Sequence, residues 1–191
     1  MINFIAGEAG IKTSAFIGIL FAFAATCLVM WKGMGMLPRD QGREFAVDGK
    51  KSAGKPRGAG FLFVLVFIAA ALLFGQVNRE MIIYLILTGA AMITGFLDDC
   101  AKTPWGEYKK GFLDLLIAVM VAVTFLNFNS NEVTILLTGA SFAIPPIVFG
   151  ILVVVLVWVS INVTNCSDGV DGLSGTLTII TLMIIYLVDL L

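Results

Sequence analysis

Residues 13–31 read TSAFIGILFAFAATCLVMW, a run of 19 residues between Lys12 and Lys32 that contains no charged side chain. A helix of this length matches the hydrocarbon thickness of a bilayer, which is about 30 Å. The core of a soluble domain of this size would not bury several such runs, whereas lipid can. The stretch therefore predicts a membrane-spanning helix and decides the fold class.

The same pattern recurs along the other parts of the 191 residues, of which 59% are hydrophobic and only 13% are charged, with a mean hydropathy of +1.01. In lipid each backbone amide must be satisfied within its own segment, so helices are the expected form. We expect an all-α, polytopic transmembrane protein with a single transmembrane domain over residues 1–191. Its six spans are expected at about 13–31, 59–77, 81–97, 112–128, 146–162 and 173–190.

The basic residues are unevenly distributed between the predicted loops. Of the 12 lysines and arginines, all but Lys12 and Arg79 fall in the loops after the first and third spans. By the positive-inside rule these loops are cytoplasmic and the N-terminus lies outside. The loop after the fifth span then shares the cytoplasmic face. The segment 128–143 lies outside, where its VTILL run predicts a short hairpin or an interfacial segment.

Two adjacent carboxylates close the third predicted span, in the stretch GFLDDCAK over residues 95–102. If the helix continued for one more turn, Asp98 and Lys102 would share a face and Asp99 would point about 100° away. Such a pair could simply mark the point where a helix leaves the membrane. It is also suited to hold a divalent cation or to accept a proton.

A polar run follows the fifth predicted span, in the stretch SINVTNCSDGVDGL over residues 160–173. Its amide and carboxylate side chains recur at spacings of three, which places them near one face of a helix or of an extended turn. A purely structural interpretation makes Asp171 the N-cap of the sixth span, but it gives no role to the other polar residues of the run. Polar groups between two lipid-embedded helices are costly to keep without function. The four residues are Asn162, Asn165, Asp168 and Asp171.

A basic, glycine-rich segment, KKSAGKPRGAG over residues 50–60, leads into the second span. It could hold phosphate through backbone amides and cationic side chains, or it could be attracted to anionic lipid head groups. Carboxylates alone would repel phosphate, so aspartates and lysines on one face indicate a polyanionic substrate bridged by a hard divalent cation, with Mg²⁺ expected. The three cysteines show no metal-ligand spacing and the chain has no histidine.

The stretches GFLDDCAK and NVTNCSDGVDGL resemble the two signature motifs of the polyprenyl-phosphate N-acetylhexosamine-1-phosphate transferases, and most of all those of its phospho-N-acetylmuramoyl-pentapeptide transferase branch. The resemblance covers essentially the whole chain. It implies transfer of phospho-MurNAc-pentapeptide from UDP-MurNAc-pentapeptide to undecaprenyl phosphate, with Mg²⁺, which gives lipid I and UMP in peptidoglycan synthesis. It also implies a multi-pass protein of the bacterial plasma membrane with a cytoplasmic active site. The expected partners are the two substrates and the lipid bilayer, with no nucleic acid and with a homodimer left open.

By position in the motifs, the resemblance implies a role for each polar residue. The expected catalytic residues are Asp98, Asp99 and Asp168, with Asp98 as the base that deprotonates the lipid phosphate. The expected substrate-binding residues are Lys102, Lys110, Asn162, Asn165 and Asp171. Asp99 and Asp171 are the candidate ligands of Mg²⁺ in this chain.

The chain departs from the resemblance in three respects. Members of the branch have about ten spans, and their main magnesium-binding aspartate and histidine-rich loop would follow Leu191. We therefore expect these 191 residues to be a truncated part that is inactive alone. The branch's TPTMGG segment reads KPRGAG over residues 55–60, and this Pro-Arg pair is closer to the related GlcNAc-1-phosphate transferases of teichoic acid and O-antigen synthesis.

Three alternatives therefore stay open. The first is a polyprenyl-phosphate GlcNAc-1-phosphate transferase, with similar chemistry and a different sugar. The second is an ion- or proton-coupled membrane transporter, whose charged groups normally lie near the bilayer midplane rather than at helix ends. The third is a non-catalytic membrane scaffold, which leaves the two motifs unexplained.

Overall fold

The computed structural model describes residues 3–40, 53–101, 103, 105–135, 138–167 and 172–189. These residues form six α-helices and one two-stranded hairpin. The helices are α1 (Asn3–Gly33), α2 (Ala59–Phe74), α3 (Arg79–Cys100), α4 (Glu107–Phe128), α5 (Pro146–Ser167) and α6 (Leu173–Asp189), and a short 3-10 turn, η1 (Met34–Met36), follows α1. The predicted all-α, polytopic class is confirmed.

Four of the described helices are long and apolar enough to cross a membrane, whereas α2 and α6 are shorter apolar helices of 16 and 17 residues. Large apolar side chains on these helices are widely exposed, as suits helices whose surfaces face lipid. Three helices continue past their predicted ends, α1 to Gly33, α3 to Cys100 and α5 to Ser167, whereas α2 ends at Phe74, short of the predicted 77. Charges and polar residues mark where the hydrocarbon ends, but the helical hydrogen bonds continue past that point.

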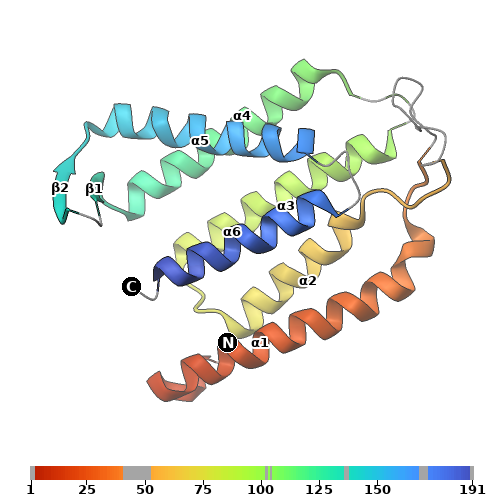
Figure 1. Ribbon diagram of the computed structural model, residues 1–191, viewed down its shortest axis with the longest axis horizontal. Helices are drawn as coiled ribbons and strands as arrows, with labels where there is room; N and C mark the ends of the chain where they lie inside the picture. Colours follow the sequence, from red (N-terminus) through yellow and green to blue (C-terminus); the bar gives the residue numbers. More distant parts are fainter. Residues whose placement is uncertain are drawn as a thin grey trace. The chain divides into compact units, whose positions relative to one another are not determined.

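The described residues divide into two compact units, residues 1–113 and 114–191. In the first unit α1, α2 and α3 alternate in direction and lie side by side (Figure 1). The C-terminal end of α3 therefore shares one end of this unit with the N-terminal end of α2. Among the described residues of this unit, the buried apolar side chains are Leu37, Val66, Ala70, Leu85 and Leu87.

The connection between α2 and α3 is a short turn built by glycine and asparagine. Gly75 leaves α2 in an extended conformation, and its N–H still donates to the carbonyl of Ala71. Asn78 caps α3, since its Oδ1 accepts the backbone N–H of Met81 at 2.7 Å. This turn sets the start of the helix that carries the acidic pair at its other end.

Gly18 allows α1 to approach α2 closely. A Cβ at this position would lie 2.8 Å from Phe74 Cβ and 3.0 Å from Phe74 Cγ, and Phe21 packs against the same ring with centroids 5.3 Å apart. We predict that Gly18→Ala in the full-length protein lowers the free energy of unfolding by about 1–3 kcal/mol, because the added methyl overpacks the contact. Thermal unfolding in detergent measures this loss.

Gly89→Ala is the matched control for this substitution. A Cβ there would lie 3.6 Å from Ile68 Cδ1, which is ordinary van der Waals contact, and alanine is favoured over glycine inside a helix by about 0.5–1 kcal/mol. This variant should be as stable as the unmodified protein or slightly more stable. An equal loss of stability in both variants would show that close approach at Gly18 is unimportant.

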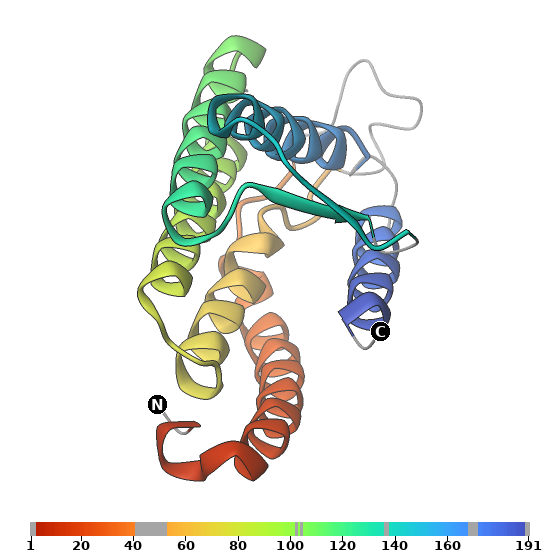
Figure 2. The same ribbon diagram turned by 90° about the vertical axis from the view of Figure 1, so that its left-hand side faces the viewer.

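In the second unit a hairpin connects α4 to α5 (Figure 2). Strand β1 (Glu132–Ile135) pairs antiparallel with β2 (Ala140–Ala143), and Asn131 closes the open end through a backbone and a side-chain hydrogen bond to Ile144. The hairpin is one of the two forms predicted for this segment. Beside it, the rings of Phe125 and Phe149 stack with centroids 5.6 Å apart, which packs the end of α4 against the start of α5.

Candidate active site

The acidic pair lies in the last turn of α3, which ends at Cys100. Ala101 is extended, with φ −69° and ψ 136°, and its N–H donates to the Asp98 carbonyl at 3.1 Å. The helix therefore ends within the motif, before Lys102, so the condition under which Asp98 and Lys102 would share a helical face is not met. Lys102 itself lies outside the described residues.

Asp98 connects the end of α3 to the start of α4. Its Oδ1 accepts the backbone N–H of Trp105 at 2.8 Å, and its Oδ2 lies 2.5 Å from Lys110 Nζ. The Asp98 side chain is 14% exposed and that of Lys110 is 32% exposed, so the pair is partly shielded from solvent. Two of the residues predicted from the sequence are thus brought together, and both oxygens of this carboxylate have a partner.

Asp99 points toward α2 instead. Its Oδ1 lies 2.9 Å from Arg57 Nη2, and the two side chains are 28% and 35% exposed. Neighbouring residues of a helix point about 100° apart, so Asp98 reaches Lys110 in α4 and Asp99 reaches Arg57 just before α2. Each carboxylate therefore faces a cation from a separate element of the chain.

Arg57 and Trp105 were not among the site residues predicted from the sequence. The basic segment that contains Arg57 was recognised from the sequence, but the partner of Arg57 was not, because the pairing depends on how α2 packs beside α3.

Lys109 and Lys110 are adjacent in the sequence, but their side chains have different partners. Lys109 Nζ lies 3.4 Å from the centroid of the Trp105 ring, whereas Lys110 pairs with Asp98.

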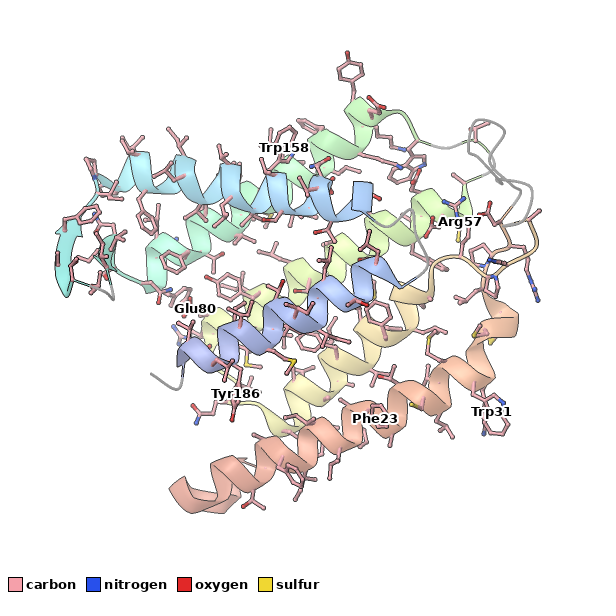
Figure 3. The ribbon with its side chains drawn as sticks, in the orientation of Figure 1. Phe23, Trp31, Arg57, Glu80, Trp158 and Tyr186 are labelled. Carbon is pink, nitrogen blue, oxygen red and sulfur yellow. The ribbon has the colours of Figure 1, made fainter. Side chains whose placement is uncertain are left out.

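The backbone before α2 is held by a short antiparallel bridge. The N–H of Arg57 donates to the Pro38 carbonyl at 2.8 Å, and the N–H of Asp40 donates to the Lys55 carbonyl at 2.9 Å. The Arg39 guanidinium adds a hydrogen bond of 2.9 Å to the Gly54 carbonyl. The two backbone bonds place Arg57 at the polar end of α3. Figure 3 shows it at the opposite end of the unit from Glu80.

The second motif lies in the other unit, where α5 continues through both predicted asparagines. Asn162 Nδ2 donates to the Trp158 carbonyl one turn earlier, at 2.8 Å. Asn165 contributes to a shallow hollow of about 410 Å³, which is lined by Ser160, Ile161, Thr164, Asn165 and Ser174. Asp168 and Asp171 lie outside the described residues. Their predicted roles stay predictions.

The described residues contain no group of three or more Asp, Glu, Cys or His side chains that could hold a metal ion. Mg²⁺ usually takes only one or two protein carboxylates and completes its shell with substrate phosphates and water. Both oxygens of Asp98 already have partners, whereas Asp99 offers a carboxylate, the hard oxygen donor that Mg²⁺ prefers, at the end of α3. Asp99 is thus chemically suited to be one ligand in such a larger set.

The model of the family described as Glycosyl transferase family 4 matches residues 81–191. The chain belongs to glycosyl transferase family 4. The matched part of this family 4 chain includes nearly all of α3 with its acidic pair, and it continues through α4, the hairpin, α5 and α6. Arg57 precedes the matched part.

Curated relatives of this family 4 chain are named phospho-N-acetylmuramoyl-pentapeptide-transferase. The relative from Treponema pallidum (strain Nichols) is 41% identical over 171 residues, which cover 87% of this chain and 47% of the relative. The relative from Gloeothece citriformis is 29% identical over 177 residues, which cover 88% and 48% of the two chains. The relative from Symbiobacterium thermophilum is 29% identical over 153 residues, which cover 72% and 45%.

The family 4 chain therefore spans about half the length of the curated relatives that it matches. No solved structure shows a significant match. The family resemblance drawn from the two motifs is confirmed by the family match and by these relatives. The long apolar helices and these relatives indicate a multi-pass membrane protein.

Proposed function

We propose that the full-length protein is a phospho-N-acetylmuramoyl-pentapeptide transferase. It would transfer phospho-MurNAc-pentapeptide from UDP-MurNAc-pentapeptide to undecaprenyl phosphate, which gives lipid I and UMP in peptidoglycan synthesis. The observation that carries the proposal is the acidic pair at the end of α3, where Asp98 and Asp99 each face a cation from a different element. Relatives with this name, similar over most of the chain, support the same activity.

The proposed chemistry places aspartate carboxylates close to a diphosphate, and these negatively charged groups repel each other. A bound Mg²⁺ would offset this repulsion. Asp99 and Asp171 are the residues proposed to hold the ion. Asp98 is proposed as the base for the lipid phosphate, and its hydrogen bond from Trp105 and its ion pair with Lys110 keep its carboxylate in one orientation. A base must lie within hydrogen-bond reach of the proton that it takes, so this fixed orientation supports the assignment.

The other predicted residues are proposed to bind substrate. Lys102 is proposed to lie near the pyrophosphate, where its positive charge would offset the negative charge of the phosphates. Asn162 and Asn165 are proposed to contact the nucleotide through their amide groups, with Asp168 as the third catalytic carboxylate. The shallow hollow beside Asn165, lined by α5 residues and by Ser174 of α6, offers room for such a contact.

We place the protein in the bacterial plasma membrane with this chemistry on the cytoplasmic side. The basic loops support this orientation, because ten of the 12 lysines and arginines fall on the same predicted face. In the first unit Arg57, Lys110 and the acidic pair lie together, as their ion pairs show. Undecaprenyl phosphate would reach this end of the helices from the inner leaflet.

Substrate turnover tests the proposal directly. Purified full-length protein, supplied with undecaprenyl phosphate and Mg²⁺, should release UMP from UDP-MurNAc-pentapeptide, and chelation with EDTA should stop the release until Mg²⁺ is restored. UDP-GlcNAc is the comparison substrate, because the Pro56-Arg57 pair is closer to the GlcNAc-1-phosphate transferases. Release of UMP from UDP-GlcNAc alone would replace the proposed sugar, and no release from either nucleotide would reject a transferase.

A further inference from the structure

We propose that Arg57 is a positioning residue, which sets the direction of the Asp99 carboxylate from the segment just before helix α2. Arg57 Nη2 lies 2.9 Å from Asp99 Oδ1. A guanidinium presents its N–H donors in a rigid plane, so it constrains the direction of a carboxylate more strongly than an ammonium group does. The expected effect of Arg57 on turnover rests on the proposed function, whereas its effect on the end of α3 does not.

The backbone that carries Arg57 is itself held in place. Its N–H is bonded to the Pro38 carbonyl, and the next residue, Gly58, has a φ of +73°, in the left-handed region that favours glycine. A Cβ at Gly58 would lie 2.9 Å from the Phe96 ring and 3.6 Å from Asp99 Oδ2. The absence of a side chain at Gly58 thus lets the start of α2 lie directly against the last turns of α3.

A ring contact one turn into α2 continues this packing. Phe61 and Phe96 stack with centroids 4.4 Å apart and an interplanar angle of 26°. The backbone is therefore held in place on both sides of Arg57, and its guanidinium approaches Asp99 from a defined direction. A partly exposed ion pair contributes little to stability, so its main consequence is the geometry of Asp99.

The two acids also need separate counter-charges. Adjacent carboxylates repel each other, and Lys110 offsets the charge of Asp98 from α4. Arg57, which lies just before α2, offsets the charge of Asp99. Loss of Arg57 would remove this counter-charge, together with the constraint that its guanidinium places on the direction of the Asp99 carboxylate.

A double-mutant cycle in the full-length protein tests this role. Arg57→Met keeps a long side chain but removes the charge and the donors. We expect it to lower kcat for UMP release by about 10–100-fold, the range for groups that orient a metal or catalytic ligand, and to leave the melting temperature nearly unchanged. Combined with Asp99→Asn it should cause little further loss, because Arg57 acts through Asp99. Arg57→Lys should recover part of the rate.

Arg39→Met is the matched control, since the Arg39 guanidinium donates to the Gly54 carbonyl in the same bridge. We expect its kcat to stay close to that of the unmodified protein. Hydrogen exchange without substrate provides a readout that needs no turnover. Exchange of the amides of residues 96–101 should be faster in Arg57→Met and unchanged in Arg39→Met, because only the first variant releases the end of α3.

Two results would overturn the role of Arg57. One is unchanged exchange at residues 96–101 in Arg57→Met. The other is a loss of kcat that is as large in the Asp99→Asn background as in the unmodified protein. Either result leaves the proposed transferase standing, provided that the unmodified protein releases UMP. If the unmodified protein releases none, the proposed function fails, and the exchange measurement alone decides whether Arg57 positions the end of α3.

Discussion

Asp99→Asn in the full-length protein is expected to lower the rate of UMP release by about 10²–10³-fold, the usual loss when one preorganised electrostatic group is removed from an active site. Asparagine has nearly the same volume as aspartate, and its oxygen can still accept a hydrogen bond from Arg57. The helix end should therefore keep its structure. The side chain loses the negative charge with which it is proposed to help hold Mg²⁺. Initial rates at saturating concentrations of both substrates measure the effect.

Glu107→Gln is the matched control for this variant. Glu107 is an exposed acid in the first turn of α4, near the polar end of α3, and it has no proposed role in the chemistry. Its turnover should stay within a few-fold of that of the unmodified protein. Thermal unfolding should give similar melting temperatures for all three proteins. Turnover of Asp99→Asn at the level of the control would remove Asp99 from the proposed chemistry.

Asp98→Asn should have an effect of comparable or larger size, about 10²–10⁴-fold, which is the range for the loss of a general acid or base. The amide oxygen can still accept the N–H of Trp105, so the connection between α3 and α4 is preserved in part. The charge that faces Lys110 is lost together with the ability to accept a proton. The same assay of UMP release measures this variant.

Lys110→Met separates two explanations of that loss. If Asp98 served only to hold Lys110 at the start of α4, removing either partner would lower turnover equally. If Asp98 is the base, Lys110→Met should be the milder variant, with a loss of about 10–100-fold from weaker positioning. Equal losses in the two single variants and in the double variant would contradict the assignment of Asp98 as base.

Much of the fold was predictable because lipid imposes a simple rule on sequence. Uncharged runs such as residues 13–31 must be helical and close to the thickness of the hydrocarbon. The ends of helices were less predictable, since α5 continues to Ser167 well beyond the last strongly apolar residues. Helical hydrogen bonds can continue into the polar region of the interface, where hydropathy no longer marks them.

The candidate site was predictable only to the level of its motifs. The acidic pair and the start of α4 were both recognised, and helical geometry alone made Asp98 and Asp99 diverge. Which cation faces each acid did not follow from the sequence. Arg57 is far from Asp99 along the chain, and their contact exists because Gly58 lets α2 approach the ring of Phe96.

The sequence by itself determined which segments form long apolar helices and that Asp98 and Asp99 lie at the end of one of them, because hydropathy and helical periodicity are local properties of the chain. Only the tertiary structure decided that Lys110 pairs with Asp98 and Arg57 with Asp99. An ion pair depends on a separation of a few ångströms, and that separation is set by the packing of helices whose residues are distant in the sequence.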